Sequence, residues 1–275
     1  MIHFICALKC EALPLIEHFK LKHKSNAHLF NIYLNEEVSL TVSGVGKLAA
    51  VAACTYSYSI LDCKDHDIWL NVGIAGHTSF SIGEVYLANR VEDESSSQVW
   101  YPQIITEPGI PTANLLTLEK ESTEYGSAMF DMEASGVMSA TSRFTTVEFV
   151  HSVKIISDNQ SSSISDISAK KVSLLIEKSK STIIHLANQL KELADELLSE
   201  IDITEEFNLF IQTWHFSQYQ KIRLEKILHR WSILTPGINA IENIKGELNN
   251  ATAILQSLNQ SLDNAPLHFG NKTDV

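Results

Sequence analysis

Basic residues are scarce in this sequence. Its 275 residues include 21 Lys and Arg against 33 Asp and Glu, which gives a formal net charge of −12 at pH 7. A field of this sign repels nucleic acids and anionic membrane surfaces. We therefore expect neither of these as a partner, and a small neutral or cationic ligand is easier to accommodate.

Long hydrophobic runs and paired cysteines are also lacking. No stretch approaches the ~18 uninterrupted apolar residues of a membrane span, and Met1–Pro14 has neither the basic start nor the apolar length of a signal peptide. The four cysteines show no CxxC pair and no metal-ligand spacing; they are Cys6, Cys10, Cys54 and Cys63. We expect reduced thiols, no metal site and a cytoplasmic protein.

Apolar residues are plentiful, at 44% of the chain, which is ample for a packed core. Short apolar runs at Ile2–Leu8, Ile68–Val72 and Phe149–Ile156 are typical of buried strands, and segments of helical periodicity lie between them. This alternation predicts an α/β fold. The length permits one large domain with an appendage or two small domains.

Acidic side chains stand at the ends of these predicted core elements. Asp131 and Glu133 lie in FDMEASGV, and Asp158 ends VKIISDN. Carboxylates beside small and apolar neighbours are candidates for function. The alternative is structural, because Glu133 also fits the first turn of a helix and Asp158 a turn that closes a strand.

A fourth acid, Glu11, follows the first predicted strand. The segment from Ala12 to Phe19 has apolar residues at helical spacing, so Glu11 falls at a strand-to-helix junction. Crevices outside the carboxyl ends of parallel strands are where α/β sheets bind ligands. A first-turn glutamate that favours the helix dipole is again the structural alternative.

Five motifs in a fixed order carry a family resemblance. They are ALKCEALPL, SGVGKLAA, NVGIAGH followed by IGEVYLA, FDMEASGV and VKIISDN. Together they resemble the purine nucleoside phosphorylase and uridine phosphorylase superfamily, especially the methylthioadenosine/S-adenosylhomocysteine nucleosidases, over about residues 1–198. The resemblance implies a three-layer fold with a central mixed, twisted sheet flanked by helices. It makes residues 1–200 the catalytic domain and residues 201–275 a C-terminal helical extension.

The resemblance also implies roles for the acids. Glu11 activates the attacking water, Glu133 accepts hydrogen bonds from the ribose hydroxyls, and Asp158 protonates or hydrogen-bonds the purine N7. The other positions that it places at the substrate are Ile74, Ala75, Gly76, Met132 and Ser157. No metal or organic cofactor is implied, and since members are commonly oligomeric we expect a homodimer. The activity would be hydrolysis of a purine nucleoside, with a place in methionine salvage.

Two departures bear on the nucleophile. The phosphorylases hold phosphate with an arginine and a serine where this sequence has Asn71 and Ile74, and the first loop lacks their glycine and arginine. Because a phosphate dianion needs charge-assisted donors, water is the expected nucleophile. A phosphate-dependent phosphorylase, and a degenerate nucleoside-binding or scaffold protein, stay open as alternatives.

The base-stacking aromatic and the last part of the chain are less well defined. Trp100, Tyr101 and Tyr125 are the available aromatics, and the sequence does not choose between them. After an amphipathic helix over Val172–Ile201, apolar residues repeat in a heptad, which predicts a helical hairpin or coiled coil. The heptad residues are Ile241, Ile244, Leu248, Ala251, Leu255, Leu258 and Leu262. This extension either packs onto its own domain or forms a partner or dimer surface.

Overall fold

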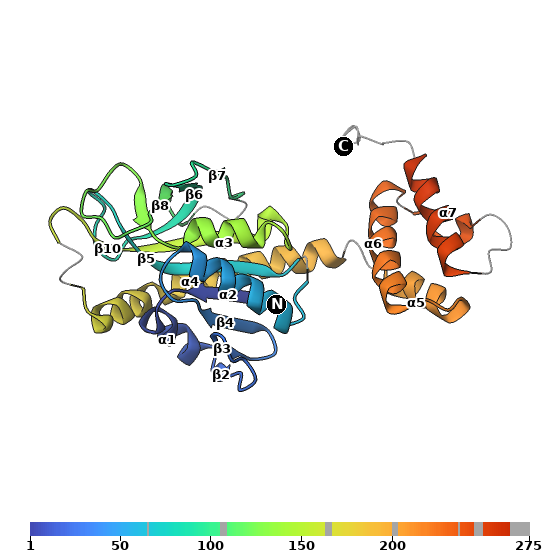
Figure 1. Cartoon of the computed structure of the whole chain (residues 1–275), viewed down its shortest axis with the longest axis horizontal. Coiled ribbons are helices and arrows are strands. Elements are labelled where there is room, and N and C mark those ends of the chain that lie inside the picture. The colour runs from blue at the N-terminus through green and yellow to red at the C-terminus, as the bar shows by residue number, and fades with distance from the viewer. Residues whose placement is uncertain are drawn as a thin grey trace. The chain divides into compact units, whose positions relative to one another are not determined.

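The chain divides into two units, Met1–Ala194 and Asp195–Val275. The computed structural model describes residues 1–64, 66–104, 109–162, 167–199, 203–235, 237–244 and 250–264. The first unit contains a β-sheet with helices, and the described part of the second unit is helical (Figure 1).

All strands of the described residues belong to one mixed sheet in the first unit. In chain order they are β1 (Ile2–Cys6), β2 (Lys22–His23), β3 (Asn31–Leu34), β4 (Val38–Val42), β5 (Ile68–Gly76), β6 (Val85–Asp93), β7 (Val99–Trp100), β8 (Thr112–Thr117), β9 (Met129–Asp131) and β10 (Val150–Asp158). The apolar runs noted in the sequence form β1, β5 and β10. These three strands are parallel to one another, so their carboxyl ends lie at one edge of the sheet.

Part of the sheet closes on itself. Strand β5 pairs with β10, β10 with β6, β6 with β8, β8 with β9, and β9 again with β5 through Gly76 and Phe130. Closure of this kind removes free strand edges. It also brings the ends of β5, β9 and β10 around one opening, although β9 is distant from β5 in sequence.

Helices cover both faces of the sheet. They are α1 (Lys9–His18), α2 (Lys47–Ile60), α3 (Ala134–Thr141) and α4 (Ala169–Ser199), with a short 3₁₀ turn η1 (Val147–Phe149) before β10. The buried residues of α1 and α4 share a cluster with Phe4, Leu70 and Val153. Those of α2 and α3 share another cluster with Ile5 and Trp69. Successive strand residues thus face opposite layers, as the alternation of side chains in a strand requires.

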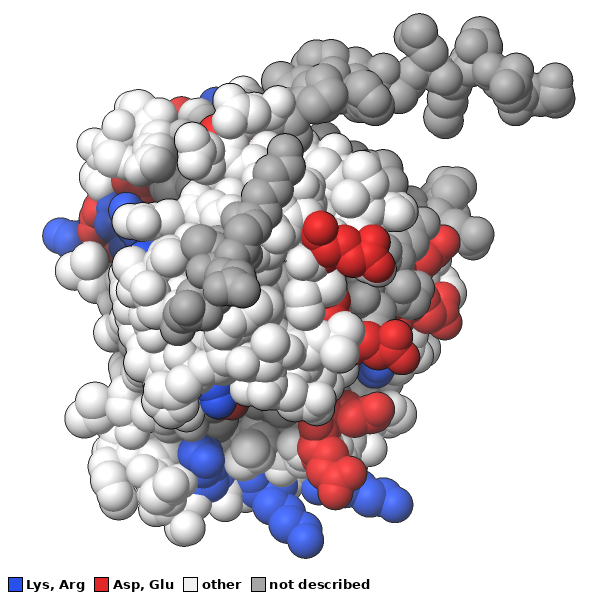
Figure 2. All heavy atoms as spheres, turned by 90° about the vertical axis from the view of Figure 1, so that its right-hand side faces the viewer, with Lys and Arg blue, Asp and Glu red and all other residues white. Residues whose placement is uncertain are grey.

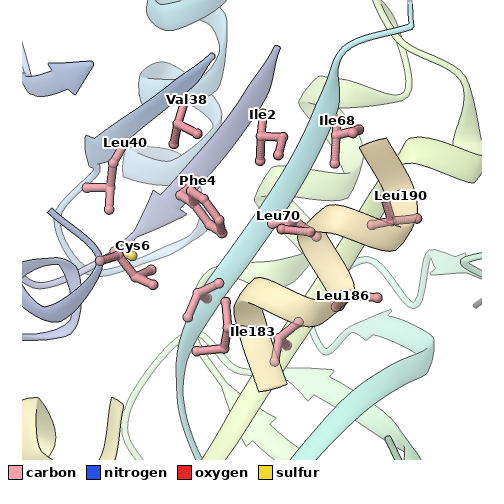
Figure 3. Packing of buried hydrophobic residues seen from close by; sticks show 14 of the residues in the cluster. Ile2, Phe4, Cys6, Val38, Leu40, Ile68, Leu70, Ile183, Leu186 and Leu190 are labelled. Atoms are coloured by element: carbon pink, nitrogen blue, oxygen red, sulfur yellow. The ribbon is translucent and has the colours of Figure 1, made fainter. Parts of the chain in front are cut away.

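The layer between β1, β4, β5 and α4 shows how this core forms (Figure 3). Side chains of Ile183, Leu186 and Leu190, spaced by three and four residues on α4, point toward Phe4 and Leu70 of the sheet. All five are fully buried. The helical and strand periodicities read from the sequence therefore meet in one apolar layer.

The second unit has its own apolar core. Its elements are α5 (Thr204–Thr213), α6 (Gln218–Leu234), the 3₁₀ turn η3 (Ile241–Asn243) and α7 (Ala251–Asp263). Phe210, Leu224, Trp231 and Leu258 are buried together in this core. The indole of Trp231 donates a hydrogen bond of 2.7 Å to the carbonyl of Ile238, which ties the segment after α6 to the helix.

The predicted heptad repeat and hairpin need correction. Residues 241–244 form a 3₁₀ turn that ends in extended backbone at Ile244, and Leu248 lies outside the described residues. The two helices at this seam are not antiparallel: Gln220 near the start of α6 bonds Thr252 near the start of α7, and Arg230 pairs with Asp263 near their ends. α5 contacts α6, which follows it in the chain, and α7 runs parallel to α6.

Figure 2 shows charged side chains of both signs, with acidic ones gathered on the right and basic ones mostly along the lower edge and at the left. In the second unit, the exposed ion pair of Arg230 with Asp263 is an example of this mixing. Such a mixed arrangement is typical of a solvated surface. Among the described residues, no helix combines the length and the apolar character that crossing a membrane requires.

Candidate active site

A cavity of about 200 Å³ opens where the carboxyl ends of β1, β5 and β10 meet the end of β9. The structure brings together every site residue expected from the sequence, because all eight line this cavity. They are Glu11, Ile74, Ala75, Gly76, Met132, Glu133, Ser157 and Asp158. Their roles remain predictions, whereas their shared location is a property of the fold.

Glu11 enters the cavity from the first turn of α1. Its carboxylate accepts hydrogen bonds from the backbone amide of Leu8 at 2.8 Å and from that of Ile74 at 3.1 Å. One acid thereby joins the end of β1 to the end of β5. Burial raises the pKa of Glu11 above its ordinary value, while the two amides and the charge of Lys154 act in the opposite direction.

Glu133 caps the start of α3 and is almost fully buried. Its Oε1 accepts a hydrogen bond of 2.9 Å from the amide of Gly46, whose φ of 102° is a backbone conformation that favours glycine. Burial, followed by the neighbouring charge of Asp131, raises the pKa of Glu133 to about 7. This carboxyl group therefore titrates near neutral pH.

A buried ion pair lies behind these acids. Lys154 Nζ is 2.8 Å from Asp131 Oδ2, and both side chains are inaccessible to solvent. Burial alone lowers the pKa of Lys154, but the charges of Asp131, Glu133 and Glu11 raise it above its ordinary value. Lys154 is thus a permanent cation among carboxyl groups. Thr117 and the amide of Ala134 complete the hydrogen bonds of Asp131.

Asp158 ends β10 with both carboxylate oxygens engaged. Ser157 Oγ donates to Oδ1 at 2.5 Å, and Tyr125 Oη donates to Oδ2 at 2.5 Å. Gly76 of β5 allows this packing: a Cβ atom there would lie 2.6 Å from both Asp158 Oδ2 and Tyr125 Cε1. The small residues after β5 therefore let an acid and an aromatic ring approach the main chain.

The structure distinguishes between the three aromatic candidates. Tyr125 lines the cavity together with Phe130, and the two rings stack with centroids 6.4 Å apart. Trp100 lies in β7, outside the cavity lining, and Tyr101 is 66% exposed to solvent and also lies outside the lining. Tyr125 and Phe130 are accordingly the aromatic surfaces that a flat ligand would meet.

Sequence reasoning missed a polar network that holds the loop before α2. Lys47 Nζ donates to Asp93 Oδ2 at 2.9 Å and pairs with Glu119, and Ser135 Oγ donates to the same oxygen of Asp93 at 2.8 Å. Burial works to raise the pKa of Asp93, yet hydrogen bonds from Lys47 and the nearby serines hold it well below its ordinary range. The signal in the sequence is weak, because Asp93 looks like part of a polar surface loop.

A potential metal-ligating group within the described residues lies elsewhere in the first unit. His3, Cys63 and Asp67 offer ligand atoms within 4.8 Å of one another. His3 Nε2 lies 3.2 Å from Asp67 Oδ2, which also accepts a hydrogen bond from the amide of Lys64. The group is thus held by internal hydrogen bonds, and none of its three residues lines the cavity.

The three layers, the partly closed sheet and the cavity at its strand ends define a nucleoside phosphorylase-like α/β fold. Its structural neighbours are consistently 5′-methylthioadenosine/S-adenosylhomocysteine nucleosidases, which confirms the fold implied by the motifs. No protein-family profile matches the sequence, and no curated protein matches it.

Three of these neighbours show the extent of the likeness. The Arabidopsis thaliana 5′-methylthioadenosine nucleosidase has 17% identity and a TM-score of 0.55, and the match covers 68% of this chain and 95% of that one. The Colwellia psychrerythraea 34H enzyme, in complex with adenine, has 15% identity, a TM-score of 0.56 and coverages of 69% and 95%. The Neisseria meningitidis enzyme, in complex with methylthio-immucillin-A, has 16% identity and a TM-score of 0.55, and the match covers 66% of this chain and 97% of that one. At these identities the likeness establishes the fold.

Proposed function

We propose that the first unit hydrolyses the N-glycosidic bond of a purine nucleoside. The substrate class is an adenine-bearing, 5′-substituted nucleoside such as methylthioadenosine or S-adenosylhomocysteine, which would place the protein in methionine salvage. One observation carries the proposal: Glu11, Glu133 and Asp158, far apart in the chain, line the same cavity. The likeness to nucleosidases supports the class of reaction.

Each acid has a task that its surroundings suit. Asp158 at the end of β10 reacts in its protonated form and gives that proton to the purine N7 as the C–N bond breaks, so that the base leaves as a neutral molecule. Exchange with solvent then returns a proton to Asp158 and removes from Glu11 the proton that it takes from water. Glu11, held by two amides, orients water and takes its proton as the oxygen attacks the anomeric carbon. Its raised pKa makes it a better proton acceptor than an exposed glutamate. General acid–base help of this kind typically contributes ~10²–10⁴ in rate.

Glu133 binds the sugar in this proposal. Two neighbouring ribose hydroxyls match a carboxylate that keeps acceptor capacity beyond its single bond from Gly46. Negative charge beneath the ring also stabilises an oxocarbenium-like transition state. Met132 lines the cavity beside Glu133 and supplies an apolar contact for the sugar.

Water is the proposed nucleophile rather than phosphate. Among the described residues that line the cavity, none is an arginine, and the one lysine, Lys120, is exposed to solvent. Asn71, which stands where the phosphorylases have their arginine, is buried and donates its amide hydrogen to the carbonyl of Ile5. A phosphate dianion would therefore lack the charge-assisted donors that offset its desolvation.

The decisive experiment incubates the full chain with methylthioadenosine, S-adenosylhomocysteine, adenosine and inosine, with and without phosphate, and measures free base by chromatography. We expect base release without phosphate. Asp158→Asn and Glu11→Gln should each lower kcat by ~10²–10⁴, whereas the exposed controls Asp62→Asn and Glu17→Gln should retain activity. Turnover that requires phosphate would identify a phosphorylase instead.

A nucleoside-binding protein without turnover is the second candidate. It is favoured by Ile74 in the cavity wall and by the two hydrogen bonds that already occupy Asp158. Calorimetry separates the two functions. Nucleoside binding that Asp158→Asn leaves unchanged, with no base released over hours, would support the binding protein and contradict the hydrolase.

We also propose a homodimer in the cytoplasm. Val45 lines the cavity and is 52% exposed, and Leu48, the second residue of α2, is 79% exposed. Apolar side chains at a cavity mouth favour cover by a second copy. Light scattering coupled to gel filtration tests this, with Leu48→Asp expected to shift the mass to that of a monomer. The cytoplasmic assignment is supported by the four free thiols.

A further inference from the structure

Tyr125 forms a hydrogen bond with Asp158 and so occupies an oxygen that the proposed reaction needs for the purine base. Tyr125 lies on the segment between β8 and β9, and its hydroxyl donates to Asp158 Oδ2 at 2.5 Å. Burial, together with the bond to Asp158, raises the pKa of Tyr125 well above its ordinary value. The phenol therefore keeps its proton at physiological pH and acts as the donor.

The other oxygen of the Asp158 carboxylate, Oδ1, also accepts a hydrogen bond. Ser157 Oγ donates to Asp158 Oδ1 at 2.5 Å and lies 3.4 Å from the carbonyl of Ala75, inside the sheet. Ser157 is buried in β10, whereas Tyr125 belongs to a segment outside the strands. Of the two partners, Tyr125 is the one that a ligand in the cavity can replace.

Tyr125 and Asp158 are packed tightly against β5. The Tyr125 ring and the Asp158 carboxylate both approach the main chain of Gly76 so closely that a single methyl group would collide with them. A base that forms a hydrogen bond to Oδ2 therefore competes with the Tyr125 hydroxyl for that oxygen. The stacked ring of Phe130 leaves an apolar surface toward which Tyr125 can move.

We propose that Tyr125 is a specificity-determining residue that holds Asp158 in the ligand-free protein and is displaced by the purine base. This inference rests on the proposed nucleosidase function and deepens it. A ligand that cannot form its own hydrogen bond to Asp158 does not compensate for the lost Tyr125 bond. The contact thereby selects bases that present a hydrogen-bond donor to Asp158, such as a purine that carries a hydrogen on N7.

The test is binding of free adenine to the full chain by calorimetry. Tyr125→Phe keeps the ring and removes the competing hydroxyl, and a hydrogen bond to a charged group is strong enough for its removal to lower Kd by about tenfold. Tyr86→Phe is the matched control, because Tyr86 Oη also bonds a carboxylate, Glu84 Oε2 at 2.9 Å, but outside the cavity. We expect the control to bind adenine as the wild type does.

The outcomes separate this inference from the proposed function. Tighter binding by Tyr125→Phe, or binding by this variant alone, supports displacement. Unchanged or weaker binding by Tyr125→Phe, while the wild type binds adenine, overturns the inference and leaves the nucleosidase proposal standing. A crystal structure with adenine gives a second readout: Tyr125 still bonded to Asp158 beside the base would overturn it too. Absence of binding in both proteins would contradict the inference and the function together.

Discussion

Replacement of Glu133 by glutamine should stabilise the protein above neutral pH. Glu133 is buried beside Asp131, and its pKa is raised to about 7 from an ordinary 4.5. That difference corresponds to about 3 kcal/mol between the two protonation states. The neutral amide of glutamine avoids the cost of the buried charge, and its oxygen can still accept the hydrogen bond from Gly46.

The sign of the pH dependence follows from the raised pKa. In the unfolded chain Glu133 loses its proton near pH 4.5, whereas in the folded protein it keeps the proton until about pH 7. The folded state therefore binds more protons between these values, and the free energy of unfolding falls as pH rises through this window. Below it Glu133 contributes no penalty, and above it the full cost of about 3 kcal/mol applies.

The assay is urea unfolding of the full chain followed by circular dichroism, at about pH 5 and about pH 8. We expect the free energy of unfolding of Glu133→Gln to exceed that of the wild type by about 2–3 kcal/mol at the higher pH and by much less at the lower pH. Glu17→Gln, on the exposed face of α1, controls for a general effect of charge removal. A stability difference that is the same at both pH values would refute the reasoning.

Three further predictions follow from the same contacts. The KM for nucleoside should rise as pH falls below about 7, because a protonated Glu133 loses acceptor capacity; initial rates across pH test this, and a flat profile would contradict it. Gly136→Ala should lower the free energy of unfolding by about 3 kcal/mol or more, because the new Cβ atom would lie 2.2 Å from a main-chain carbonyl oxygen of α2. Gly109→Ala is the control: a Cβ atom there has open space around it, so the free energy of unfolding should not change. Lys154→Met should cost about 3–5 kcal/mol by leaving Asp131 buried and unpaired, and adding Asp131→Leu should recover part of that loss; an additive double variant would argue against the pair.

The sequence predicted those parts of the fold that depend on local pattern. Runs such as Ile2–Leu8 become β1 because a continuous apolar stretch of this length is buried on both faces of a parallel sheet. Parallel strands then place their carboxyl ends together, which is why Glu11 and Asp158 could be expected near one another. The order of the motifs supplied the rest of the fold.

Contacts between segments that are far apart in the sequence were harder to predict. The bond between Tyr125 and Asp158 depends on the segment between β8 and β9, whose path is set by closure of the sheet at Gly76 and Phe130. The parallel packing of α6 and α7 likewise depends on the return path between them, because the spacing of apolar residues is the same for either direction. Periodicity defines which face of a helix is buried, but it does not determine which element packs against that face or in which direction.

The charges of the site explain why such a pocket would favour a cationic transition state. Glu11, Glu133 and Asp131 are buried around one cation, Lys154, so the acids outnumber the base. Burial, and after it the charge of Asp131, raises the pKa of Glu133 to about 7, so this group keeps its proton up to near-neutral pH. Positive charge that develops on a sugar in the cavity would relieve the same excess and draw Glu133 into its ionised form. Strain of this kind lowers stability, and in the proposed reaction it would favour the transition state over the ground state.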